Sequence, residues 1–129
     1  MLKVVLDTNI LVSALLTSGP PAFIVDLMAD GKIIPFYSGL IIEEYYEVLS
    51  REKFNFNPVQ VIRLIDDITR VGIAIEGKLS AKNKKVDDDD KKFYDAAKEA
   101  NAFLITGNIR HFPKEDFIVT PSQFLSLYC

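Results

Sequence analysis

Short apolar runs alternate with longer amphipathic stretches along this chain. The runs are nearly continuous and rich in β-branched residues, a pattern typical of strands buried on both faces of a sheet. They cover residues 2–6, 33–37, 71–75, 103–106 and 117–119. The stretches between them carry apolar residues at helical spacing. Helices are therefore expected at residues 9–16, 22–29, 38–51 and 58–72, in the segment that follows Asp90, and from residue 121 onward.

This alternation predicts a parallel sheet with helices on both faces, a three-layer α/β/α sandwich. Polar residues and prolines mark several helix starts: Ser38 is a capping residue, and Asn57 and Thr120 each precede a proline. In a sheet of this kind ligands bind beyond the carboxyl ends of the strands. Candidate functional residues are therefore sought at those ends.

The composition is that of one globular domain spanning residues 1–129. Hydrophobic residues make up 49% of the chain, enough for a sizeable core, and the length leaves little room for a second domain. The first strand reaches Asp7 too soon for a secretory signal, and no apolar run approaches the length that spans a bilayer. The lone cysteine, Cys129, cannot form an internal disulfide. We expect a cytoplasmic protein with no membrane segment.

Asp7 is the first candidate for chemistry, because it stands directly after the first strand and at the mouth of the next helix. An aspartate in that position can cap the helix. It can also point beyond the end of the strand, toward a ligand. The residue taken alone leaves both interpretations open.

Glu44 is the second candidate, on the helix expected at 38–51. At about 100° per residue, the apolar stripe of this helix has Glu44 at its border, whereas Glu43 falls almost opposite. An acid at the border can face the rim of the sheet. Glu43 and Glu47 are expected to face solvent.

Four consecutive aspartates, Asp87 to Asp90, precede the next helix, and Asn108 follows the fourth strand. Acids in a first turn interact favourably with the helix dipole, but four adjacent negative charges repel one another. On the helical wheel Asp89 and Asp90 lie toward the apolar side, so one of these two is a candidate ligand. Oxygen ligands with no His or Cys among them match Mg²⁺ or Mn²⁺ rather than zinc.

Four segments in order along the chain resemble the motifs of the PIN domain, and within that family the VapC-like ribonuclease toxins of toxin–antitoxin systems. The first segment is residues 4–16, where Asp7 resembles the first metal-binding acid of the family. The second is residues 42–51, where Glu44 is the acid that matches. The resemblance implies that both carboxylates are catalytic.

The third segment is residues 87–97, and the family spacing selects Asp90, with Asp89 as the fallback. The fourth is residues 104–108, where the family usually has Asp and this chain has Asn108. An amide still offers a carbonyl oxygen to a metal ion, but the substitution removes a negative charge. The resemblance thus implies a metal site of three carboxylates and one amide.

The family fold is a five-stranded parallel sheet in the order 3-2-1-4-5. This order makes the first and fourth strands neighbours and would bring Asp7 and Asn108 together. Thr8 and Asn9 follow Asp7 directly and are expected to support the metal ligands or to shape the turn. Packing is the other interpretation of these two residues.

The implied function is hydrolysis of RNA by a Mg²⁺- or Mn²⁺-dependent endoribonuclease, the toxin of a toxin–antitoxin pair. A small antitoxin protein and a homodimer are the expected partners. Because the net charge is -3, RNA binding would depend on local basic patches. The candidates for such contacts are Arg51, Lys53, Lys78, Lys82, Lys84, Lys85, Arg110, His111 and Lys114.

Two other interpretations fit parts of the sequence. A PIN fold that has lost catalysis and serves as an RNA-binding or assembly module is kept open by Asn108. A receiver-like phosphoacceptor domain, with Asp7 phosphorylated, needs a lysine at a strand end, and Thr106-Gly107-Asn108 offers none. Metal-dependent cleavage of RNA would separate the first of these from an active nuclease.

Overall fold

A single five-stranded parallel sheet forms the centre of the computed structural model, which describes residues 1–78 and 86–128. The strands are β1 (Lys3–Leu6), β2 (Ile34–Tyr37), β3 (Ile73–Ala74), β4 (Phe103–Ile105) and β5 (Ile118–Val119). Their order across the sheet is β3-β2-β1-β4-β5, and every neighbouring pair is parallel. The expected strand order is confirmed. Lys82, Lys84, Lys85 and Cys129 lie outside the described residues.

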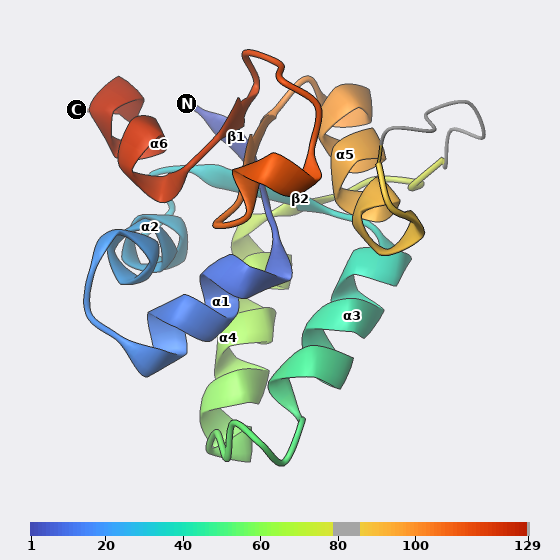
Figure 1. Ribbon diagram of the computed structural model, residues 1–129. Helices are drawn as coiled ribbons and strands as arrows, with labels where there is room; N and C mark the ends of the chain where they lie inside the picture. The colour runs from blue at the N-terminus through green and yellow to red at the C-terminus, as the bar shows by residue number, and fades with distance from the viewer. Residues whose placement is uncertain (79–85, 129) are drawn as a thin grey trace.

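Six α-helices and one 3-10 helix surround this sheet in the described part of the chain (Figure 1). They are α1 (Thr8–Leu16), α2 (Pro20–Ala29), α3 (Gly39–Leu49), α4 (Pro58–Val71), α5 (Asp88–Ala100), η1 (Ile109–His111) and α6 (Pro121–Tyr128). Helix α5 packs against β1, β2 and β4, whereas α4 packs against β2, and α2 contacts α1, α4 and α6. The three-layer α/β/α sandwich is confirmed. Among the described residues no single helix is long and apolar enough to cross a membrane, and only α1 and α2 together, bent by 105°, meet that criterion.

The predicted start signals act through side-chain hydrogen bonds. Ser38 Oγ accepts the Ile41 N–H at 3.3 Å, and Asn57 Oδ1 accepts the Val59 N–H at 2.9 Å. These bonds satisfy N–H groups that have no partner within the helix itself. At the start of α6 the hydrogen bond runs from the preceding residue to a side chain of the helix, since Gln123 Oε1 accepts the Thr120 N–H at 2.9 Å.

The third strand is shorter than its apolar run predicts, because α4 continues through Val71. Gly72 separates the helix from the strand in a very tight space. A Cβ at this position would lie 2.4 Å from the Pro35 carbonyl oxygen and 2.5 Å from that of Ile68. Any side chain here would push α4 away from β2, so the run can serve as a strand only after Gly72.

Candidate active site

Asp7 directly follows β1 and lies almost completely buried, with 6% of its surface exposed. Although it is the N-cap residue of α1, its side chain accepts no capping hydrogen bond from that helix. Its Oδ2 atom instead accepts hydrogen bonds from Thr106 Oγ1 at 2.8 Å and Asn9 Nδ2 at 3.2 Å. The side chain thus makes no capping hydrogen bond, although the backbone of Thr8 at the start of α1 lowers its pKa, and its hydrogen bonds hold it at the end of the sheet.

The register of β1 and β4 explains why Thr106 is the neighbour of Asp7. Leu6 pairs with Ile105, so the residues that follow each strand stand side by side. Asn108 lies two residues further on, is exposed, and reaches Asp7 only indirectly: its backbone N–H donates to Thr106 Oγ1 at 3.0 Å. Strand order thus brings Asn108 near Asp7, with the Thr106 hydroxyl between them as the group that contacts Asp7 directly. Asn108 as a metal ligand stays a prediction.

Glu44 is half-buried on α3 and is engaged at both carboxylate oxygens. The Thr8 hydroxyl donates to Oε2, and Lys92 Nζ donates to Oε1 at 2.7 Å. Glu43 is exposed and faces solvent, as the helical wheel predicted. Glu47 is exposed as well and forms an ion pair with Arg51 at 2.8 Å.

Asp90 lies in the first turn of α5, with 19% of its side chain exposed. His111 Nδ1, on η1, lies 3.7 Å from Asp90 Oδ2. Asp89 is exposed, so the prediction that it also faces inward is wrong. The helix begins at Asp88, and its phase turns Asp90 inward while the backbone carbonyl of Asp89 accepts a hydrogen bond from Lys92 at 2.9 Å.

The three acids act on one another electrostatically. Burial raises the pKa of Asp7 from its ordinary value of 3.8 to about 6, and the charges of Asp90 and Glu44 add to the increase, whereas the hydrogen bond from Thr106 opposes it. Burial also raises the pKa of Asp90, the nearby His111 lowers it, and Glu44 is among the acids that raise it. The charges of the neighbouring acids therefore make ionisation of Asp7 and of Asp90 less favourable.

Tyr45 fixes the position of α3 at the end of β1. It is buried, and its hydroxyl donates to the Leu6 carbonyl oxygen at 2.5 Å. Burial, together with the charges of Asp7 and Glu44, raises the pKa of Tyr45 well above its ordinary value, so the phenol stays neutral and keeps its proton for this bond. The neighbouring Glu44 is thereby held at the edge of the sheet.

The donor set fits a hard divalent cation, because it consists of carboxylate and amide oxygens. In residues 1–78 and 86–128 no three acidic, His or Cys side chains converge closely enough to hold a metal ion as they stand. The ammonium group of Lys92 takes up the Glu44 carboxylate in this arrangement. Asp7, Glu44 and Asp90 are the residues that would hold the ion, with Glu44 released from Lys92.

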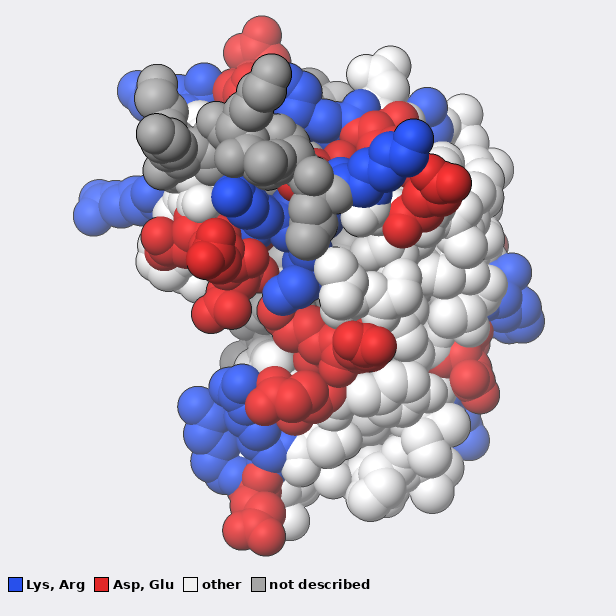
Figure 2. Space-filling model, turned by 90° about the vertical axis from the view of Figure 1, so that its right-hand side faces the viewer, with Lys and Arg blue, Asp and Glu red and all other residues white. Residues whose placement is uncertain are grey.

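The basic residues predicted to contact RNA differ in whether another side chain already engages them. Arg51 is paired with Glu47, and Lys53 Nζ lies 5.1 Å from the centre of the Phe54 ring. Arg110 is exposed on η1, beside His111. Figure 2 shows the face that carries α3 and α5, where acidic side chains gather and Lys and Arg patches lie directly beside them. A polyanion approaching this face would meet both signs of charge.

Thr106 and Lys92 are the two site residues that sequence reasoning missed. The signal for Thr106 was available: parallel strands in register place the residue after β4 beside the residue after β1. Lys92 follows Asp90 by two positions among the lysines of the charged segment, and nothing in the sequence separates it from Lys91. Thr8 and Asn9 contact Glu44 and Asp7 respectively, while their part in catalysis stays a prediction.

Fold and site together define an α/β protein with an acidic, oxygen-only centre at the carboxyl ends of its strands. The PIN domain model matches residues 3–110, so the chain belongs to the PIN domain family. It is 33% identical over 111 residues to MJ1680, an uncharacterized protein of Methanocaldococcus jannaschii, covering 83% of this chain and 71% of that protein. This relative adds sequence similarity without a described activity.

A solved structure shares the fold. A chain in the crystal structure of VapBC2 from Rickettsia felis, bound to a DNA fragment from their promoter, matches with a TM-score of 0.59. The match covers 92% of this chain and 97% of that chain at 20% sequence identity. The likeness shows that the two chains share one architecture.

Proposed function

We propose that this protein is a metal-dependent endoribonuclease that hydrolyses RNA phosphodiester bonds. The observation that carries the proposal is the position of Asp7, Glu44 and Asp90 near the carboxyl ends of the strands, where the charges of Glu44 and Asp90 raise the pKa of Asp7 and the charge of Glu44 raises the pKa of Asp90. Membership of the PIN family, whose domains are generally nucleases, supports it. Mg²⁺ or Mn²⁺ held there would activate water and neutralise charge that builds up on the phosphate oxygens.

Different side chains hold the different carboxylates of this proposed centre. Thr106 and Asn9 fix one oxygen of Asp7 and leave the other free of side-chain hydrogen bonds in the described structure. Thr8 orients Glu44. His111, beside Asp90 and more than half exposed, is placed to donate to a phosphate oxygen of the substrate. These contacts set the carboxylates before substrate arrives, which lowers the cost of organising them during the reaction.

We further propose that the protein is the toxin of a toxin–antitoxin pair. The resemblance to VapC-like toxins and the shared fold with VapBC2 support this role. A small antitoxin that covers the acidic centre is the partner that the proposal requires. A homodimer and a cytoplasmic location belong to the same proposal.

The test is cleavage of single-stranded RNA by the purified chain in Mn²⁺ or Mg²⁺, compared with EDTA. Activity should require the metal, and Glu44→Gln should abolish it, whereas the matched variant Glu43→Gln on the same helix should retain it. Full activity in EDTA would contradict the metal mechanism. A folded protein that binds RNA and cleaves none with either metal would favour a catalytically degenerate PIN domain.

A further inference from the structure

A cavity of about 510 Å³ is lined in part by Ile109 and Arg110 of η1, the 3-10 helix whose third residue, His111, lies near Asp90. It is lined by residues of η1, of the segment that leads to β5, of β5 itself and of α6. Its volume is in the range of small-molecule sites in proteins, about 300–1,000 Å³. Within the described residues it has no part in the acidic centre, yet the two share a wall: Arg110 lines the cavity, and its neighbour His111 faces Asp90.

The floor of this cavity is apolar. Phe112, Ile118 and Val119 line it, although each has less than a tenth of its surface exposed. A floor of one ring and two branched side chains can receive a flat aromatic base, because every nucleobase presents an apolar π-face. The recognised group is thus expected to be planar and partly apolar.

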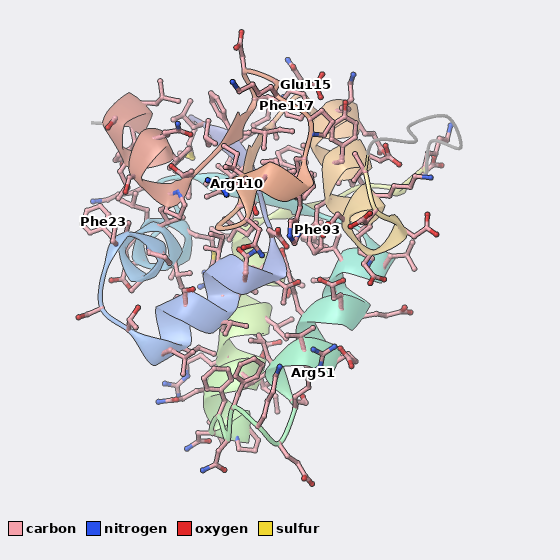
Figure 3. The ribbon with its side chains drawn as sticks, viewed as in Figure 1. Phe23, Arg51, Phe93, Arg110, Glu115 and Phe117 are labelled. Atoms are coloured by element: carbon pink, nitrogen blue, oxygen red, sulfur yellow. The ribbon has the colours of Figure 1, made fainter. Side chains whose placement is uncertain are left out.

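The rim carries charged groups that the fold itself does not use. Arg110 and Lys114 are exposed and form no hydrogen bond or ion pair in the described structure. Figure 3 shows Arg110 leaving η1 in the direction of α6. An unpaired guanidinium and an ammonium beside an apolar floor suit a phosphate attached to a base.

The acidic residues of the rim do not cancel this preference. Glu115 is occupied, since it accepts a hydrogen bond from the Tyr94 hydroxyl. Asp116 is exposed and can accept a hydrogen bond from an exocyclic amino group, as carboxylates do in base recognition. The Gln123 amide oxygen caps α6, which leaves its NH₂ group as a donor toward the cavity. Donors and acceptors therefore both surround the floor.

We propose that this cavity binds one unpaired nucleotide of the RNA substrate, with its base against Phe112, Ile118 and Val119 and its phosphate at Arg110 and Lys114. The strand then crosses η1 to reach Asp7 and Asp90. Only a single strand or loop can place a base there, because bases in an A-form duplex stay stacked and paired. The inference rests on the proposed ribonuclease function and adds a site that selects the nucleotide next to the cleaved bond.

The first test is direct binding, measured on the full chain in EDTA by ¹⁵N NMR with each common ribonucleoside monophosphate and with inorganic phosphate. At least one nucleotide should shift the amide signals of Phe112, Ile118 and Val119. Inorganic phosphate should leave the floor signals in place. If no nucleotide moves the floor signals, the base site is overturned, whether or not the protein cleaves RNA.

The second test uses Arg110→Gln and its matched control Arg63→Gln, at an arginine on α4 that is also exposed and forms no ion pair in the described structure. Arg110→Gln should raise the KM for single-stranded RNA about tenfold and leave kcat nearly unchanged, because it removes a contact made before and during cleavage. Arg63→Gln should change neither constant. Equal KM values for the two variants would overturn the inference while leaving the ribonuclease proposal intact.

A set of short RNAs, each with one abasic ribose at a different position, separates the contribution of the base to binding from that of the phosphate. Removal of the base at one position next to the cleavage site should raise KM in the unaltered protein and have little further effect in Arg110→Gln. Indifference to every abasic position would mean that Arg110 holds phosphate alone, and the base site would be overturned. Nucleotide binding by a protein that cleaves no RNA would instead overturn the proposed function and keep the site.

Discussion

The acidic centre has two halves that are built differently. At the carboxyl ends of β1 and β4, Asp7 is held in place by the register of the two strands and by the hydroxyl of the fully buried Thr106. Across from it, on α3 and α5, Glu44 is held by the ammonium of Lys92, and Asp90 lies near the half-exposed ring of His111. The first half is fixed by the sheet and the core. The second half is held by charges together with the Thr8 hydroxyl, which donates to Glu44, and a divalent cation can take the place of the charges.

In the proposed metal centre this difference would separate two tasks. A rigid carboxylate defines where the ion sits, and the buried hydrogen bonds to Asp7 supply that rigidity. A carboxylate that exchanges a cationic side chain for the ion is itself never left unpaired when the ion enters. A substitution in one half leaves the residues of the other half intact.

The largest effect is expected from Asp7→Asn. The amide keeps the oxygen that Thr106 and Asn9 contact, but it removes the charge that a metal ion requires. Since a metal ion contributes several kcal/mol to catalysis, RNA cleavage should fall by about a hundredfold or more. Asp30→Asn, at an exposed aspartate, is the control and should cleave normally. Retention of activity in Asp7→Asn would remove Asp7 from the ligand set.

The same variant changes how stability depends on pH. The folded protein holds a proton on Asp7 up to about pH 6, whereas an unfolded chain releases it near 3.8. The metal-free protein should therefore lose about 3 kcal/mol of unfolding free energy as pH rises from 4 to above 6, through this group alone. Asp7→Asn should flatten that part of the profile and melt higher at neutral pH. Parallel profiles for the two proteins would mean that Asp7 ionises freely.

Lys92→Met tests the adjustable half. Methionine keeps the length of the side chain and removes the charge that neutralises Glu44 at 2.7 Å. The metal-free protein should lose about 2 kcal/mol, the size of a hydrogen bond to a charged group. Mn²⁺ should bind more tightly because no ammonium competes for the carboxylate. Calorimetric titration with Mn²⁺ and metal-free melting curves measure both effects.

Lys91→Met is the matched control for that change. Lys91 is similarly shielded, with 20% of its side chain exposed, but it pairs with the exposed Asp88 at 3.7 Å. The control makes the same change in net charge one position away. If both variants bind Mn²⁺ alike, overall charge explains the change and the Lys92–Glu44 pair does not control metal entry.

Thr106→Val tests the fixed half with a smaller expected effect. Valine has nearly the same shape and no hydroxyl, so Asp7 loses the hydrogen bond that lowers its pKa, and the Asn108 N–H loses its acceptor. We expect a loss of about 1–2 kcal/mol in stability. The acidic limb of the pH–rate profile should move to higher pH. Thr69→Val, whose hydroxyl bonds only a helix carbonyl, should leave that limb in place.

The two halves also differ in how far the sequence predicts them. The sheet order and Asp7 follow from apolar runs and family motifs, because buried strands leave a clear pattern. The choice of Glu44 over Glu43 followed from helical periodicity. Lys92 was invisible to such reasoning, since its role depends on how α5 packs across α3. The outward direction of Asp89 depended in the same way on which residue begins α5.

The smallest effect is expected at Asn108, the position where this chain departs from the acid usual in its family. Its side chain makes no hydrogen bond in the described structure and is exposed, so Asn108→Asp adds a charge near Asp7 without removing a contact. A fourth carboxylate should tighten Mn²⁺ binding, because affinity at oxygen sites follows ligand charge. The gain should be limited to about twofold to tenfold, since exposed charges interact through water and Asp7 lies behind Thr106. Initial cleavage rates at increasing Mn²⁺ should give a lower metal midpoint and the same plateau. An unchanged midpoint would place Asn108 outside the metal site and leave the fixed half with Asp7 as its ligand.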